Sequence, residues 1–94
     1  MVPYLVTTAK RGVFFGYHAP IPSDTVPDVL TLKDCRVVVY WSAQTRGFTG
    51  LASTGPAAGS RVGNKAPETT LSEITSISLC SPAAAKAFES GVWS

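Results

Sequence analysis

Three regularly spaced glycines in the segment TGPAAGSRVG could hold an anion. They are Gly55, Gly59 and Gly63, each four residues from the next. Glycine lets successive backbone N–H groups converge on an anion. Ser60 adds a hydroxyl, and Arg61 adds a fork of N–H donors that suits phosphate. The pattern predicts an anion-binding loop over residues 54–63. The alternative is a wide turn whose glycines serve only the backbone geometry.

Two further arginines and two aromatic residues lie near the ends of predicted strands. These are Arg11, Arg46, Tyr17 and Trp41. Arg46 is the predicted second charge partner of a ligand in the glycine loop. Aromatic faces beside arginine side chains can stack a nucleobase. The alternative is that both aromatic residues close the ends of the hydrophobic core.

Catalytic and metal chemistry find little support in the sequence. The single histidine, His18, stands beside a proline-rich loop, and no serine occurs in a G-x-S-x-G context, so a nucleophile with an oriented base is not indicated. One histidine and two separated cysteines do not make a zinc set. We therefore expect a protein that is not an enzyme and that uses no metal or cofactor.

Composition points to one small domain over residues 1–94. Hydrophobic residues make up 45% of the chain and charged residues only 15%. A small surface with few charges favours a homo-oligomer, in which contacts between copies cover the remaining apolar area. The net charge of +2 is too weak for a protein that lives on duplex DNA.

The remaining sequence features favour an intracellular protein. There is no signal-peptide pattern and no apolar run long enough to span a membrane. The two cysteines, Cys35 and Cys80, are too few for a disulfide scaffold, and we expect both to be reduced and at least one to be buried.

The pattern of apolar, β-branched and turn residues predicts a mainly β fold. The predicted strands are PYLVTTA, RGVFFGYH, VLTLKD, CRVVVYWSA, GFTGLAST and TTLSEITSISLC. The first two form a hairpin, Gly50 marks a bend in the fifth, and a bulge near Ser76 reconciles the apolar spacing of the last. Ser81 and Pro82 predict the start of a helix over about residues 82–90.

These elements suit a small antiparallel barrel or a strongly bent sheet of five to six strands, closed by the short C-terminal helix. Bent strands marked by glycine favour an SH3-like or Sm-like architecture. This architecture does not by itself assign a function.

Four segments together resemble a family of short phage and prophage proteins without assigned function. They are RGVFFG, LKDCRVVVYWS, TRGFTGLASTGPAAGSRVG and TLSEITSISLCSPAA. The resemblance covers about residues 4–93, and YWSAQTRGFTGLASTGP is its most specific part. It implies a viral origin and a small accessory role in the cytoplasm of the host cell, and it brings no catalytic residues.

Three functions follow from these observations. The first is a non-enzymatic, homo-oligomeric binder of a phosphorylated small molecule or a short nucleic acid, which could sequester a host defence signal. The second is a protein–protein inhibitor of a host factor. The third is a virion or assembly component. The arginine, glycine and aromatic residues favour the first, whereas the low charge favours the others.

Overall fold

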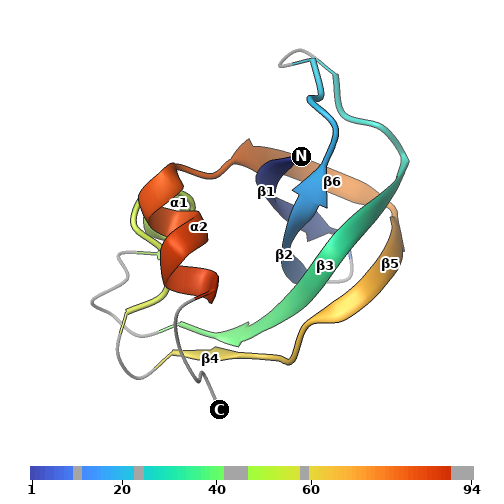
Figure 1. Ribbon diagram of the computed structural model, residues 1–94. Helices are drawn as coiled ribbons and strands as arrows, with labels where there is room; N and C mark the ends of the chain where they lie inside the picture. Colours follow the sequence, from blue (N-terminus) through green and yellow to red (C-terminus); the bar gives the residue numbers. More distant parts are fainter. Residues whose placement is uncertain (10–11, 23–24, 42–46, 58–59, 90–94) are drawn as a thin grey trace.

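The computed structural model describes residues 1–9, 12–22, 25–41, 47–57 and 60–89 (Figure 1). Six strands and two short helices make up this part of the chain. The strands are β1 (Val2–Thr8), β2 (Val13–His18), β3 (Val29–Tyr40), β4 (Arg61–Val62), β5 (Ala66–Ser72) and β6 (Ile74–Leu79), and the helices are α1 (Gly47–Ser53) and α2 (Pro82–Glu89).

All strand pairs are antiparallel and belong to one curved sheet. The order is β4-β3-β2-β1-β6, and β5 also pairs with β3. Only Glu73, with a φ of 56°, separates β5 from β6, although these strands pair with opposite ends of the sheet. The chain therefore crosses from one edge to the other at this corner. The sheet is not closed into a barrel, because no strand pairing joins β5 to β6 among the described residues.

β3 is one long strand where the sequence analysis expected two. Its first half pairs with β5, and its last residues pair with β4. The pairing with β2 shifts between Phe15, which faces Arg36, and Tyr17, which faces Lys33. Asp34 lies within this shift and has a φ of 49°. The bulge bends the strand without ending it, so one strand replaces the predicted pair.

Each face of the sheet packs against its own hydrophobic core. The first core lies under the helices and contains Leu5, Phe15, Val38, Leu51, Val62, Cys80, Ala84 and Phe88. The second lies on the inner face of the curve and contains Tyr4, Val6, Leu30, Leu32, Cys35 and Leu71. The neighbours Phe14 and Phe15 serve different cores, as alternation along a strand requires.

The C-terminal helix begins where the sequence predicted. The Ala84 N–H donates to Ser81 Oγ at 3.0 Å, which is an N-cap bond, and Pro82 is the first helical residue. Phe88 of α2 stacks on Phe15 of β2 with ring centroids 4.2 Å apart. This stack fixes the helix on the first core.

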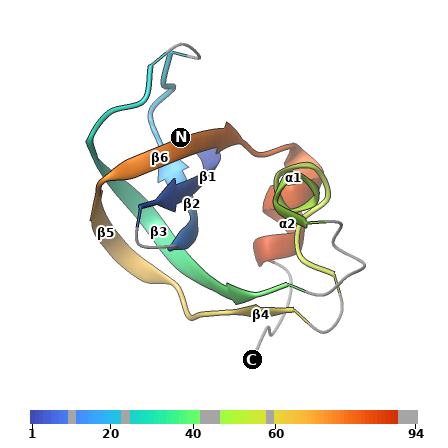
Figure 2. The same ribbon diagram turned by 180° about the vertical axis from the view of Figure 1, so that it is seen from behind.

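The predicted fifth strand, GFTGLAST, is wrong, because residues 47–53 form α1. Phe48, Leu51 and Ala52 are spaced by three and four residues, which is the spacing of a helical face. Leu51 is fully buried in the first core, and α1 packs beside α2 (Figures 1 and 2). Tertiary packing thus overrides the β-like composition of this short segment.

The predicted bulge in the last strand is confirmed. Thr7 of β1 pairs with Ser76, but Thr8 pairs with Ile74, so Thr75 has no partner in the register. The Thr7 hydroxyl hydrogen-bonds to both the Thr75 and the Ser76 hydroxyls, at 2.8 and 2.5 Å. The predicted strand is also divided at Glu73 into β5 and β6.

Candidate functional site

Gly55, the first glycine of the predicted loop, ends α1 and lies against α2. Its N–H donates to the carbonyl oxygens of Gly50 and Leu51, each at 3.1 Å, and its φ is 83°. This is the left-handed residue that commonly ends a helix. A Cβ at this position would lie 2.5 Å from the Ala87 Cβ. Both observations give Gly55 a role in joining the two helices.

The backbone donors further along the loop also have partners within the chain. The Ser60 N–H donates to the Ala57 carbonyl at 3.1 Å, and the Ser60 residue is buried. The Gly63 N–H donates to the Val37 carbonyl at 2.8 Å. Gly59 lies outside the described residues. The N–H groups of Gly55, Ser60 and Gly63 therefore stabilise the fold, and an anion at this loop would rely on side chains.

The structure brings together only part of the predicted side-chain set. Arg61 is exposed on β4 and faces Tyr40 in the register, and the half-buried Trp41 follows directly. Tyr17 instead faces Lys33, near the middle of β3. Arg61 and Trp41 thus share one end of the sheet, whereas Tyr17 does not join them. The remaining predicted arginines, Arg11 and Arg46, lie outside the described residues.

Tyr17 packs at the margin of the first core. Its ring lies edge-on to Phe15, with centroids 5.4 Å apart. Burial and the negative charge of Glu89 raise the pKa of the Tyr17 hydroxyl. These contacts match the alternative that the tyrosine closes the end of the core.

A charged cluster that the sequence pattern did not predict lies at the end of α2. Glu89 accepts a hydrogen bond from Lys65 Nζ at 2.7 Å and lies 3.6 Å from Arg36 Nε. Arg36 Nη1 also donates to the Gly63 carbonyl at 3.2 Å. The bond to Glu89 raises the pKa of Lys65. On the neighbouring strands, Lys33 and Glu68 form another ion pair. These contacts cross-link β3, β5 and α2.

A different edge of the molecule carries no charge at all. No charged residue occurs over residues 74–85, which span β6 and the start of α2, or over residues 47–60, which include α1. β6 is the last strand of the sheet and pairs only with β1 in the described structure. Its outer edge is therefore uncharged and has no strand partner among the described residues.

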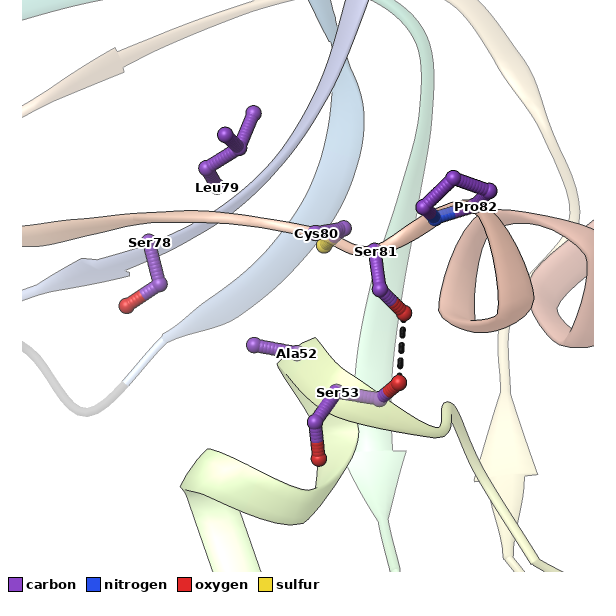
Figure 3. A pocket seen from close by; sticks show the side chains of 7 residues that line it. All are labelled: Ala52, Ser53, Ser78, Leu79, Cys80, Ser81 and Pro82. Atoms are coloured by element: carbon purple, nitrogen blue, oxygen red, sulfur yellow. Dashed lines mark hydrogen bonds between the residues drawn. The ribbon is translucent and has the colours of Figure 1, made fainter.

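A pocket of about 380 Å³ lies beside this edge, between β6 and α1 (Figure 3). Ala52 and Ser53 line it from the helix, and Ser78 and Cys80 line it from the strand side. The Ser81 hydroxyl donates to the Ser53 carbonyl and so ties the strand end to α1. In Figure 3 the Ser78 side chain leaves β6 on the same side of the strand as α1.

A second pocket, of about 180 Å³, lies on the other side of β6. It is lined by Tyr4, Ile21, Val26 and Ile77 together with Leu79, and the Ile21 N–H donates to the Tyr4 hydroxyl at 2.8 Å. Leu79 contributes to both pockets and is 63% exposed. In Figure 3 its side chain points away from α1, opposite to Ser78. We call β6 with these two flanking pockets the β6 surface.

The two edges of the sheet differ in their protection against pairing. β5 carries Pro67 and Glu68, and proline and charge are the usual devices that stop an edge strand from pairing with another chain. β6 carries neither. The uncharged run over residues 74–85 is readable in the sequence, but the sequence does not reveal that it lies at a free edge.

Both cysteines are buried and unpaired, as expected. Burial raises the pKa of the Cys80 thiol to about 12 and also raises that of Cys35. Because the thiolate is the nucleophile, neither thiol is activated near neutral pH. Cys80 therefore contributes to packing although it lines the larger pocket.

The described residues contain no group of three or more His, Cys, Asp or Glu side chains placed to hold a metal ion. In the same part of the chain, no helix is long and apolar enough to cross a membrane.

The chain belongs to a family described as Domain of unknown function (DUF6948), whose sequence profile it matches over residues 1–88. No curated protein and no solved structure matches it.

Proposed function

We propose that this member of a family of unknown function is a non-enzymatic protein-binding protein that binds its partner at the β6 surface. The observation that carries the proposal is the exposed Leu79 on a neutral edge strand between two pockets. Charged residues are depleted at the centres of protein interfaces, and burying such an edge desolvates no charge. The function corresponds to the second of the three sequence-based hypotheses.

The chemistry of the surface indicates an extended polypeptide as the bound element. A free strand edge offers alternating N–H and C=O groups that another strand can pair with. The two pockets lie on opposite sides of β6, where alternate side chains of an added strand would point. Backbone pairing would supply affinity, and the pockets would supply side-chain preference.

Selection from a random peptide library on immobilised protein tests this proposal. Wild-type protein should enrich peptides with alternating apolar residues, and Leu79→Lys should weaken their binding by at least about tenfold, because a buried leucine contributes roughly 1.5–3 kcal/mol. The matched control is Val29→Lys, since Val29 is 57% exposed on β3, a strand that does not pair with β6 and lines neither flanking pocket. Equal binding by both variants would remove the β6 surface as the binding site.

A second candidate function is the binding of a phosphorylated ligand beside Arg61. It is favoured by the exposure of this arginine at the end of the sheet that also carries Trp41, and by its lack of an ion pair with any residue in the described ranges. A charge-assisted hydrogen bond contributes about 1.5–3 kcal/mol, so Arg61→Ala should weaken binding by roughly 10- to 150-fold. Calorimetric titration with mononucleotides, cyclic dinucleotides and short RNA tests this, and no binding of any by wild type would exclude it.

The same proposal includes the fold relationship, the biological role and the identity of the bound protein. The continuous path from β5 to β6 around Glu73 supports a relationship to SH3-like and Sm-like small barrels. The sequence resemblance to short phage proteins supports a viral accessory role in the host cytoplasm. In that setting, the bound protein would be a host factor or another copy of the chain.

A further inference from the structure

We propose that the β6 surface binds β6 of a second copy of this chain, so that two sheets join through an antiparallel strand pair across a two-fold axis. This inference rests on the proposed function, because it identifies the protein partner of the same surface. Three features carry it: the direction of the backbone groups of β6, the absence of charge, and the position of the bulge.

The backbone groups of Ile77 and Leu79 point to the free edge. The Cys80 N–H donates to the Pro3 carbonyl at 3.0 Å, which continues the pairing of β6 with β1. Hydrogen-bonding direction alternates along an antiparallel strand. Ser78 and Ser76 therefore bond to β1, whereas the N–H and C=O groups between and beside them face outward.

The charge distribution favours a second copy as the occupant. In a two-fold pair the same strand edge lies on both sides of the junction. An edge with charges of one sign would therefore face the same charges on the other copy and be repelled. β6 has no charge to repel, whereas β5 has Glu68 and the interrupting Pro67. A partner chosen for opposite charge would instead favour an edge that carries charge. Neutrality thus matches self-pairing better than it matches a charged partner strand.

The bulge fixes the position of the two-fold axis. Thr75 interrupts the pairing with β1, and a bulge twists the strand at that point, which leaves Ser76–Leu79 as the regular edge. With the axis at Ser78, the outward-facing residues Ile77 and Leu79 pair with each other across the junction and the bulge residue Thr75 stays outside the pairing. Leu79 of one copy then pairs with Ile77 of the other, and the two Ser78 residues face each other as a pair without backbone hydrogen bonds.

Light scattering and sedimentation equilibrium test the dimer. Wild type should be a dimer at micromolar concentration, and Leu79→Lys should raise the dissociation constant by at least about tenfold by placing two lysines at the junction. Val29→Lys should remain a dimer. Circular dichroism checks that each variant folds. A wild-type monomer at concentrations on the order of 100 μM would overturn the inference.

A cysteine cross-link tests the register. Facing residues in a pair without backbone hydrogen bonds have Cα atoms about 4.5 Å apart, within disulfide range. Under mild oxidation Ser78→Cys should form a covalent dimer whose mass map joins residue 78 to residue 78, and Val29→Cys should stay monomeric. A Ser78→Cys protein that cross-links no better than this control would overturn the proposed pairing.

The outcomes separate the inference from the proposed function. A wild-type monomer that still selects peptides sensitive to Leu79→Lys retains the protein-binding surface but excludes the second copy. A dimer that is unaffected by Leu79→Lys and gives no cross-link at residue 78 excludes β6 pairing. A monomer that selects no such peptide excludes both.

Discussion

Replacing Gly55 with alanine tests whether this glycine serves the helix junction. A non-glycine residue with left-handed backbone geometry costs about 1–2 kcal/mol. The added Cβ would lie 2.5 Å from Ala87 Cβ and 3.0 Å from the Ala84 carbonyl oxygen. Such an overlap forces a shift that costs about 1–3 kcal/mol. Alanine also lowers the conformational entropy of the unfolded chain, which offsets about 0.4–1 kcal/mol of this cost. We expect Gly55→Ala to lower the free energy of unfolding by about 2–4 kcal/mol.

This loss is large against the total stability of the protein. A chain of 94 residues has a free energy of unfolding of about 5–14 kcal/mol. Urea titration followed by circular dichroism measures the difference, provided that the slope of the transition is unchanged. A glycine kept only for close approach of a ligand would leave the stability nearly unchanged.

A double-mutant cycle with Ala87→Gly isolates the contact between Gly55 and α2. Ala87→Gly alone should cost about 1 kcal/mol, because glycine is a poor helix former. In that background Gly55→Ala should still cost the left-handed geometry and the contact with the Ala84 carbonyl oxygen, but no longer the overlap with the Ala87 Cβ. The two effects should therefore depart from additivity by at least about 1 kcal/mol. A Gly55→Ala effect below about 0.5 kcal/mol, or strict additivity in the cycle, would refute the reasoning.

Two further predictions concern the packing around the β6 surface. Ser81→Ala should lower the free energy of unfolding by about 0.5–2 kcal/mol in urea titration, because it removes the N-cap of α2 and the bond to Ser53. Ser72→Ala, at an exposed serine of β5, is the control and should leave the midpoint unchanged. A Ser81→Ala protein as stable as wild type would contradict the capping role. Burial raises the pKa of the Cys80 thiol from 9.0 to about 12 in the folded protein. Between pH 9 and pH 12 this thiol therefore ionises only in the unfolded chain, and the free energy of unfolding should fall by up to about 1.4 kcal/mol per pH unit. Cys80→Ala should reduce this slope, and an unchanged slope would show that other groups cause it.

Local rules in the sequence were sufficient for several elements. Ser81 followed by proline marked the start of α2, because capping acts within one helical turn. The apolar spacing after Leu71 indicated a bulge, which the structure places at Thr75. The β-branched and aromatic runs marked β1, β2 and most of β3, since strand composition follows from burial on both faces.

The glycine-rich segment was the point where local reasoning failed. Its first part was predicted as the strand GFTGLAST and its second part, residues 54–63, as an anion-binding loop, whereas the structure forms α1 from the first part. Leu51 enters the first core, and Gly55 reaches α2, which follows some 30 residues later in the chain. A seven-residue helix is too short to be stable alone, so its conformation is decided by packing against distant residues.

The sequence by itself determined a mainly β chain with a short C-terminal helix, two buried thiols and few charges. Only the tertiary structure decided which uncharged run became a free edge. The sharp corner at Glu73 places β5 and β6 at opposite ends of the sheet, and pairing with β1 leaves the outer side of β6 open. Strand order depends on contacts between residues far apart in the chain, and composition and spacing within one segment do not encode those contacts.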